Sequence, residues 1–529
     1  MPTLNFKGKT FVQNHHLAVK YHELVPKNDK SLTGKVSLND NLILHGDNLK
    51  ALKALLPNYA GKVKCIYIDP PYNTGNERWV YNDNVNSPMM QEWLGKIVDR
   101  EDFTRHDKWL CMMMPRLKLL RELLREDGVI FVSIDDNEAH HLRMLMDEVF
   151  GDDNFVQNFM WLHGKGKKDT WSRTLQQYIL CYAKNKNMLP QWSILGYAQY
   201  EFSNPDNDPR GSWFSGSISF SEKRSRKEHP NYFVIKSPSG TVWKRQWHCT
   251  KEEMEEYLKE NKIFFGLPPK YNNVPRLKIF PGDTEELIPP NIIDDVETTR
   301  EAQRNLDFIF GEKLFDFPKP VGLIKRLLQI STNQNSIILD SFAGSGTTAH
   351  AVLALNKEDG GKRKSILVEC EDYADKITAE RIRRVIKGIP KAKDEQLREG
   401  LGGTFSYFEL GDPIEMESIL EGDKLPSFLE LARYVFYTAT GEEFDSSQVD
   451  EKRNFIGESK EYEAYLFYKP DIEYLKSTAL TLERAKNLGP YNGKKRLVFA
   501  PSKYLDTDYL LKYRIDYCQL PFEIYKLKE

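Results

Sequence analysis

An acid, two prolines and a tyrosine follow one another where a hydrophobic run of the sequence stops. The apolar residues from Val63 to Ile68 predict a buried strand, and Asp69-Pro70-Pro71-Tyr72 comes directly after it. Because prolines cannot continue a sheet, we expect the Asp69 carboxylate at the sheet's carboxyl edge, where α/β folds bind ligands. The Asp69 carboxylate and the Pro70 carbonyl can each accept an N–H from the exocyclic amine of a planar base, while Tyr72 stacks on the base. The pattern predicts chemistry on such an amine.

The same residues also have a structural interpretation, in which a polyproline turn follows the strand and Asp69 only caps the next helix. Two other predicted strands favour an active-site edge, because each also ends near an acid. Asp47 follows the strand near 41–44, and Asp135 follows the strand at 129–134. Helical segments alternate with these strands, which predicts an α/β fold with a parallel sheet.

A glycine-rich string, DSFAGSGTT at residues 340–348, follows a further predicted strand. Its glycines allow the backbone to approach a ligand closely, and the first N–H groups of the next helix point toward that ligand. Glu369 ends the following strand about twenty residues later, where a carboxylate meets the ribose hydroxyls of a nucleoside cofactor. The spacing also fits a dinucleotide-binding loop, so a dehydrogenase is the alternative from another enzyme class.

Between about residues 154 and 310 the alternation of strands and helices stops, except for one core strand expected near 178–184. Aromatic and basic residues are interleaved there, as a DNA-reading insert requires, since Lys and Arg neutralise phosphates and polar side chains bond base edges. The alternative is a mixed α/β insert with a solvated charged face. The candidate DNA-binding residues are Lys165, Lys167, Lys168, Arg210, Arg224, Arg226, Lys244 and Arg245.

Bulk composition narrows the class of protein. A chain of 529 residues is expected to form about two to four domains. The net charge of −2 gives no overall basicity, so a DNA partner would need a local basic face. The six cysteines are scattered without a CxxC pair, so we expect reduced thiols and no metal site. No segment has the character of a signal peptide or a membrane span, so a cytosolic protein without a membrane partner is expected.

The strings DPPYNTG and DSFAGSGTT together resemble motif IV and the S-adenosylmethionine-binding motif I of the amino-methyltransferases that modify adenine N6 or cytosine N4 in DNA. The catalytic string precedes the basic insert and the cofactor string follows it, an order similar to that of the β class. The strings HGDNLKAL, IFVSIDDNE, YILCYAKN and FDFPKP look closer still to the modification (Mod) subunits of type III restriction–modification systems. The C-terminal RLVFAPSKYLDTDYL is similar to their tails.

The resemblance implies a Rossmann-like α/β methyltransferase core, split by a target-recognition insert, plus a C-terminal α+β domain. It implies four parts: residues 1–153 with the catalytic half of the core, 154–310 with the target-recognition region, 311–389 with the cofactor-binding half, and 390–529 for interaction or assembly. The catalytic residues would be Asp69, Pro70, Pro71 and Tyr72. The cofactor-binding residues would be Asp340, Phe342, Gly344, Gly346, Thr347, Glu369, Lys319 and Asp47.

The implied reaction is methyl transfer from S-adenosylmethionine to adenine N6 in duplex DNA, with the target base flipped out of the helix. The implied partners are double-stranded DNA, a second copy of the chain and an ATP-dependent restriction subunit, in the prokaryotic cytosol and associated with the nucleoid. Cytosine N4 methylation remains an alternative, although a leading Ser is commoner there than Asp69. The sequence also allows a solitary methyltransferase or a catalytically silent DNA-binding subunit.

Overall fold

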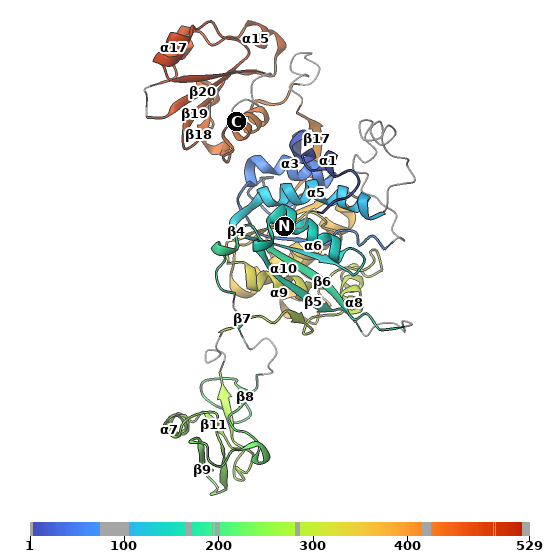
Figure 1. Ribbon diagram of the computed structural model, residues 1–529, viewed down its shortest axis with the longest axis vertical. Coiled ribbons are helices and arrows are strands. Elements are labelled where there is room, and N and C mark those ends of the chain that lie inside the picture. The colour runs from blue at the N-terminus through green and yellow to red at the C-terminus, as the bar shows by residue number, and fades with distance from the viewer. Residues whose placement is uncertain are drawn as a thin grey trace. The chain divides into compact units, whose positions relative to one another are not determined.

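The computed structural model in Figure 1 describes residues 4–74, 105–164, 171–192, 194–195, 202–280, 286–414, 425–489, 491 and 493–520. The chain forms two compact units. Unit 1 comprises Met1–Pro190 and Asn291–Glu529, and unit 2 comprises Gln191–Pro290. Unit 2 is narrower than the insert expected at 154–310, because the segments on either side of it belong to unit 1.

A ten-stranded, mostly parallel sheet is the centre of unit 1. Its six central strands run parallel, and the expected core strand near 178–184 is β6, which pairs antiparallel with both β4 and β5. In spatial order the strands are β1 (His22–Pro26), β17 (Ser406–Pro413), β2 (Leu42–His45), β16 (Lys364–Glu369), β15 (Ile337–Asp340), β3 (Val63–Ile68), β4 (Leu124–Ile134), β6 (Gln176–Ala183), β5 (Phe155–Leu162) and β14 (Ile292–Ile293).

Helices cover both faces of this sheet, which explains why its central strands are continuous apolar runs. All six residues of β3 are buried, as expected for a strand covered on both sides. One face packs against α3 (Asn48–Tyr59), α5 (Arg105–Leu123) and α6 (Ala139–Phe150). The other packs against α8 (Thr299–Phe310), α10 (Thr347–Asp359) and α11 (Glu380–Lys387), with α9 (Val321–Ser331) beside α10. The predicted α/β fold is confirmed.

The C-terminal part of unit 1 has a core of its own. A four-stranded sheet of β18 (Phe455–Glu458), β19 (Tyr462–Leu466), β20 (Lys495–Ala500) and β21 (Ile515–Gln519) packs against α14 (Phe428–Thr440). Short helices α15 (Ile472–Ser477), α16 (Leu482–Lys486) and α17 (Thr507–Lys512) complete an α+β arrangement. None of the helices in the described ranges has the length and hydropathy needed to span a membrane.

Unit 2 is a small β-rich body with one main helix. It contains the three-stranded sheet β11 (Ile263–Phe264), β12 (Arg276–Ile279) and β8 (Phe214–Ser217), and the hairpin of β9 (Tyr232–Lys236) and β10 (Val242–Gln246). Helix α7 (Lys251–Lys259) begins at a capping box formed by Thr250 and Glu253. The apolar core joins residues of the hairpin, α7 and β11: Ile218, Ile235, Trp247, Met254, Ile263 and Phe265.

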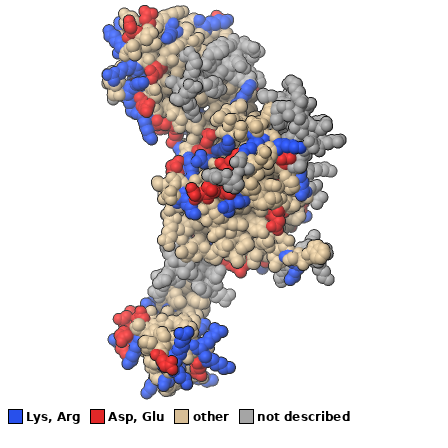
Figure 2. Space-filling view, in the orientation of Figure 1, with Lys and Arg blue, Asp and Glu red and all other residues tan. Residues whose placement is uncertain are grey.

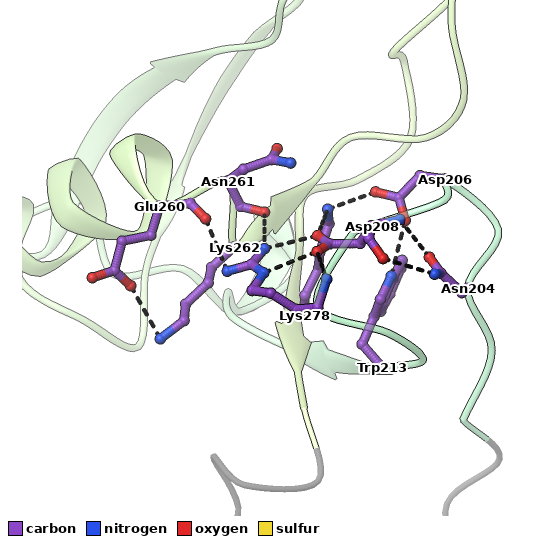
Figure 3. Close-up of polar contacts among 9 residues, drawn as sticks. Asn204, Asp206, Asp208, Trp213, Glu260, Asn261, Lys262 and Lys278 are labelled. Atoms are coloured by element: carbon purple, nitrogen blue, oxygen red, sulfur yellow. Dashed lines mark hydrogen bonds and ion pairs between the residues drawn. The ribbon is translucent and has the colours of Figure 1, made fainter.

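A buried charge cluster holds the loop at 204–213 against β12 in unit 2 (Figure 3). Lys278 is 1% exposed and pairs with Asp206 at 2.5 Å and Asp208 at 2.8 Å. Arg210 binds Asp208 through two nitrogens, at 2.7 and 2.9 Å. Two acidic and two basic side chains therefore neutralise each other. The hydrogen bond from the Arg210 side chain is the main reason that the pKa of Asp208 lies well below its usual value, and the bond from Lys278 adds to the effect.

Candidate active site

Three carboxylates lie at the ends of three adjacent parallel strands. Asp69 follows β3, Asp340 ends β15 and Glu369 ends β16, and β15 pairs with both β3 and β16. Because the carboxyl ends of parallel strands meet at one edge, this register brings the catalytic string and the glycine-rich string to the same edge of the sheet. The two halves of the predicted site are separated by more than 250 residues of sequence and by one strand spacing in the fold.

The Asp69 carboxylate is held by two side chains of the chain itself. The Tyr72 hydroxyl donates to Oδ1 at 2.8 Å, and Lys319 Nζ donates to Oδ2 at 2.5 Å. The Lys319 ammonium also lies 5.0 Å from the centroid of the Tyr72 ring, within the range of a cation–π contact. Burial and the neighbouring Asp69 raise the pKa of Tyr72 well above its usual value, so its phenol remains a donor. Lys319, expected beside the cofactor, contacts the catalytic carboxylate in this structure.

The two prolines present their carbonyl groups differently. The indole N–H of Trp109, on α5, donates to the Pro71 carbonyl at 2.7 Å. Among the described residues no donor bonds the Pro70 carbonyl. Trp109 could not be recognised from the sequence, because its apolar helical spacing indicates only a core residue.

A cluster around Glu138 holds the far side of the catalytic turn. Glu138 is 0% exposed, and its carboxylate accepts a bond from Asn73 and contacts His106 at 2.6 Å and His141 at 2.8 Å. Asn73 follows Tyr72 directly and has a left-handed backbone with φ of 57°, a conformation that asparagine tolerates. The cluster thus anchors the turn that carries Asp69 and Tyr72.

Among the described residues, His106, Glu138 and His141 form a group whose possible ligand atoms lie close enough together to hold a metal ion. Hydrogen bonds join its members directly, so their arrangement needs no ion. Asn73 lies in the string at 69–75 and Glu138 ends the string IFVSIDDNE, but their contact could not be predicted, because they are 65 positions apart.

The glycine-rich turn forms a cradle at the end of β15. Gly344 and Gly346 have φ of 52° and 80°, and a Cβ added to Gly346 would lie 3.1 Å from the Thr378 carbonyl oxygen. The Gly344 N–H donates to Glu369 at 2.7 Å, so the turn is bound to the neighbouring strand end. The Ser341 hydroxyl is buried and has no hydrogen-bond partner among the described residues. A backbone open to close approach and an unmatched buried hydroxyl are features of a ligand site.

Burial changes the acidity of both carboxyl groups beside this turn. It raises the pKa of Asp340 to about 7, with negative Asp69 and Glu369 nearby adding to the effect. Burial likewise raises the pKa of Glu369 to about 7, although three backbone N–H groups oppose the shift. Asp340 accepts bonds from the Phe342 N–H at 3.0 Å and the Thr348 hydroxyl at 2.6 Å. Two such carboxyls fit a cationic ligand, whose charge favours their ionised forms.

Arg381, from α11, is a further residue that the sequence did not indicate. Its buried guanidinium donates to Ser345 at 2.9 Å and to the Thr347 hydroxyl oxygen at 2.8 Å, and burial lowers its pKa to about 9. The Thr347 hydroxyl in turn donates to the Lys319 carbonyl at 3.2 Å. The glycine-rich turn, the start of α10 and the Lys319 segment are therefore linked.

The two remaining acids at this edge have local structural partners. Asp47 caps α3 by accepting the Lys50 N–H at 3.0 Å and lines a hollow of about 400 Å³ beside His45 and Glu409, at β2 rather than β15. Asp135 accepts bonds from the backbone and side chain of Asn137 at 2.9 and 2.8 Å. Asp47 thus lies on the far side of β16 from Asp340.

The candidate DNA-binding residues differ in their surroundings. Lys165, Lys167 and Lys168 lie outside the described residues. Arg210 belongs to the buried charge cluster of unit 2, and its guanidinium also donates to the Glu260 and Asn261 carbonyls. Four of them are exposed, namely Arg210, Arg224, Arg226 and Lys244, whereas Arg245 is half-buried with its guanidinium 5.3 Å from the Trp243 ring.

Known proteins match most of this chain. A family model described as DNA methylase matches residues 63–380. The type III restriction-modification enzyme StyLTI Mod subunit of Salmonella typhimurium is 32% identical over 83% of this chain and 70% of the relative. The EcoPI Mod subunit of Escherichia phage P1 is 33% identical over 72% of this chain and 68% of the relative. The type II methyltransferase M.KpnI of Klebsiella pneumoniae is 31% identical over 61% of this chain and 79% of the relative.

These matches confirm the resemblance to type III modification subunits. The family match also includes both the catalytic string at 69–75 and the glycine-rich string at 340–348, which decides against the dehydrogenase alternative. On its sequence and on the strand-end geometry that unites the two strings, the chain belongs to the DNA methylase family.

Proposed function

We propose that this protein transfers the methyl group of S-adenosylmethionine to the N6 amine of adenine in duplex DNA. The observation that carries the proposal is the adjacency of β3 and β15, which puts Asp69 and the glycine-rich turn at one sheet edge. A base amine bound at Asp69 and a nucleoside bound at the glycine-rich turn would lie one strand spacing apart. Binding two reactants in such an orientation supplies much of the acceleration that a transfer reaction needs.

The cofactor would be held by the cradle at the end of β15. Gly344 and Gly346 would let the backbone approach it, Glu369 would bind the ribose hydroxyls, and Asp340 would lie near the charged methionine end. Phe342 and Thr347 line the same turn. When bound, S-adenosylmethionine supplies an electrophilic methyl group on its sulfonium. The raised pKa values of Asp340 and Glu369 support this assignment, because a cation restores the ionised carboxylates that burial disfavours.

Asp69 and the Pro70 carbonyl would accept the two N–H bonds of the adenine amine. A carboxylate offers about four lone-pair positions, so Asp69 can accept an amine proton while it keeps its bonds from Tyr72 and Lys319. Accepting both protons turns the nitrogen lone pair away from the ring and toward the methyl group. The N–C bond then forms as the C–S bond breaks, and the nitrogen gives up one proton along its hydrogen bond to Asp69.

Duplex DNA hides the adenine amine in the base stack, so the base must leave the stack at a cost of a few kcal/mol. Tyr72 would receive the face of the flipped base. Its ring is oriented by bonds from its hydroxyl to Asp69 at 2.8 Å and to Gln177 at 3.3 Å. An aromatic platform fixed beside the amine acceptors provides both stacking and alignment.

The biological setting belongs to the same proposal. Two relatives are named as type III Mod subunits, which supports a role in a restriction–modification system in the bacterial cytosol, with a restriction subunit and a second copy of the chain as partners. The similarity to M.KpnI, named as a type II methyltransferase, favours a second candidate, a methyltransferase that acts without a bound restriction subunit. Adenine is preferred to cytosine because the catalytic string begins with Asp69.

The test is modification-sensitive sequencing of genomic DNA from a host without methylases that expresses the wild-type chain, Asp69→Ala or Asp136→Ala. Asp136 is an exposed acid near the end of β4 and serves as the matched control. We expect N6-methyladenine in one short motif with the wild type and the control, and none with Asp69→Ala. Modified cytosine would overturn the base assignment, and unchanged methylation by Asp69→Ala would overturn the mechanism.

Calorimetry with S-adenosylmethionine separates the two halves of the site. Asp69→Ala should bind the cofactor nearly as well as the wild type, whereas Glu369→Ala should bind it more weakly. Loss of cofactor binding in Asp69→Ala alone would contradict the assigned roles.

A further inference from the structure

The β9–β10 hairpin of unit 2 has one face in the core and the other in solvent. Ile235 and Trp247 belong to the core cluster, and Phe233 and Trp243 pack against it. Alternate residues along both strands point the other way, as the period of two requires. The Trp247 indole donates to the Phe233 carbonyl at 3.0 Å, which fixes the inner face to the rest of the unit.

The exposed part of the outward face consists of two valines and two lysines, Val234, Lys236, Val242 and Lys244, which we call the ribbon face. All four are exposed, and the valines are 44% and 55% exposed. The Lys244 ammonium lies 5.6 Å from the centroid of the Tyr232 ring on the same face. Val234 pairs across the strands with Lys244, and Lys236 pairs with Val242, so apolar and basic side chains alternate in a checkerboard. Valines held in water beside lysines serve no packing purpose within unit 2.

The turn between the strands is braced by hydroxyl groups. The Ser237 hydroxyl accepts the Thr241 N–H at 3.1 Å and contacts the Ser239 hydroxyl at 3.0 Å, and the Ser237 N–H donates to the Thr241 carbonyl at 2.9 Å. Gly240 has φ of 86°, which the turn requires. A braced hairpin keeps its outward side chains in a defined geometry, which lowers the entropy cost of binding.

A basic segment, residues 223–227 with the sequence KRSRK, is bonded to the open end of the hairpin. The Arg226 N–H donates to the Gln246 side chain at 2.8 Å, and the Gln246 N–H donates to the Ser225 hydroxyl at 3.1 Å. The Gln246 side chain is buried between them, whereas Lys223, Arg224, Arg226 and Lys227 are exposed. The basic segment and the ribbon face therefore keep a fixed relation to each other.

Charge is segregated within unit 2. From Ser221 to Trp247 there are seven Lys and Arg residues and two Glu, whereas α7 has four Glu and two Lys. Figure 2 shows Lys and Arg side chains gathered on one side of this unit, and acidic side chains over α7 on another. A surface with one strongly positive side is complementary to a polyanion.

We infer that the β9–β10 hairpin enters the major groove of duplex DNA and reads base edges, while the basic segment 223–227 binds the flanking phosphates. The inference rests on the proposed function and names the element that selects the DNA sequence. A major groove about 12 Å wide admits a two-stranded ribbon. Lysines on such a ribbon reach the guanine O6 and N7 acceptors, and valines contact the thymine methyl group. The Lys–Val checkerboard suits a site that contains both bases.

Contacts within unit 2 argue against a DNA-binding role for two arginines that composition alone had indicated. Arg210 binds Asp208 and two backbone carbonyls, and Arg245 packs beside Trp243 with its guanidinium 3.7 Å from Glu222. Both hold unit 2 together, so the inference assigns neither to base recognition.

The experiment compares three double variants of the full-length protein with the wild type. They are Lys236→Ala/Lys244→Ala on the ribbon face, Arg224→Ala/Arg226→Ala in the basic segment, and Lys251→Ala/Lys259→Ala on α7 as a charge-matched control. All six residues are exposed, so folding should be unchanged, and circular dichroism checks this. Two readouts are made: the methylated motif in genomic DNA, and binding to duplexes with and without that motif at several salt concentrations.

The ribbon variant should lose about 10- to 100-fold of its discrimination between the two duplexes and should methylate a relaxed motif. The basic-segment variant should bind both duplexes more weakly, with the slope of log affinity against log salt reduced by about 2, and should keep the motif. The α7 variant should match the wild type. An unchanged motif and unchanged discrimination in the ribbon variant would overturn the inference, and would leave the surface to a protein partner.

A failure of the proposed function can be distinguished from a failure of the proposed DNA-binding surface. A wild-type protein that methylates no DNA would overturn the proposed function. The salt titration needs no methylation, so equal salt slopes in the wild type and the basic-segment variant would overturn the DNA surface whether or not the enzyme is active.

Discussion

The catalytic edge of unit 1 and the ribbon face of unit 2 use polar side chains in opposite ways. Asp340, Glu369 and Glu138 are almost fully buried, and each is bonded to other groups of the chain. Lys236 and Lys244 stand in water on a braced hairpin. Chemistry on an amine requires acceptors that are already oriented in a low-dielectric site, whereas sequence reading requires side chains that stay exposed until DNA arrives.

Unit 2 also shows that charge alone does not identify a binding surface. Lys278 and Arg210 carry positive charge as Lys244 does, yet Lys278 pairs with Asp206 and Asp208 inside the unit (Figure 3), and Arg210 pairs with Asp208. A basic side chain that is buried or paired with an acid stabilises the unit, whereas an exposed one without an acidic partner is available to bind DNA. Five predictions test the two regions, and they follow in order of decreasing effect.

The strongest test of the catalytic edge is Asp69→Ala. Removal of the carboxylate deletes an acceptor for the amine proton and leaves Lys319 without its partner. We expect kcat to fall by about 1,000-fold or more with little change in DNA affinity, measured by transfer of a labelled methyl group. Asp69→Asn should recover little of the rate, because the amide lacks the negative charge, and its nitrogen cannot accept the bond that a carboxylate oxygen accepts from Tyr72 or Lys319. A fall in DNA affinity with normal kcat would show that Asp69 binds DNA and does not take part in the reaction.

The framework charges of unit 2 are tested by Lys278→Ala. This change leaves Asp206 and Asp208 with one fewer base in a buried setting, which should cost about 3 kcal/mol of stability. The loss should appear as earlier proteolysis within 191–290, while unit 1 retains its denaturation midpoint. Lys270→Ala, an exposed lysine of the same unit, is the control and should change nothing. Equal behaviour of the two variants would contradict the framework role.

A change in the Glu138 cluster should have a smaller effect, because this cluster positions the turn that carries Asp69. Glu138→Gln should cost about 2 kcal/mol of stability, because an amide cannot accept from Asn73 and both histidines as a carboxylate does. We expect kcat to fall while KM for DNA stays the same, since the turn carrying Asp69 loses its anchor. Glu126→Gln, on an exposed acid, is the matched control. A change in KM alone would show that the cluster does not act through the catalytic turn.

The pKa values of Asp340 and Glu369 predict a pH dependence of cofactor binding. Both pKa values are about 7, so part of each carboxyl group is protonated at neutral pH. A cationic cofactor favours the ionised forms, so its binding releases protons and tightens as pH rises toward and just above 7. We expect about a tenfold gain per pH unit below 7 for each proton released, from calorimetry in buffers of different ionisation enthalpy. An affinity that falls as pH rises would contradict the assignment.

The same groups affect the stability of the protein without cofactor, with the opposite sign. Their pKa values are raised from 3.8 and 4.5 to about 7, so the folded chain binds more protons than the unfolded chain between these values. Their contribution to the free energy of unfolding therefore decreases as pH rises from about 4 to 7. Chemical denaturation across this range measures it.

The strands of the core could be predicted closely from the sequence, and the boundary of the insert could not. The apolar run at 63–68 is followed by two prolines, which leaves little freedom in where β3 ends. The region after residue 154 has the aromatic and basic composition of the insert, yet β5 and β6 pair with each other and β6 pairs with β4. The apolar run near 178–184 indicated a core strand, whereas composition did not indicate that β5 pairs with it, because pairing depends on residues distant in the sequence.

Local patterns of residues were enough to predict the family, the α/β core and the two strings that we propose carry the chemistry, because each string lies at a strand end. The contacts that hold those strings in place became known only from the folded chain. Lys319 contacts Asp69, Glu138 anchors Asn73 and Arg381 braces the glycine-rich turn through contacts between residues 34 to 250 positions apart. Folding also buried Lys278 and paired Arg210 with Asp208, and it left Lys244 exposed without an acidic partner among the ion pairs of the described residues. Whether a charged side chain is buried depends on what packs around it, and no local pattern records that.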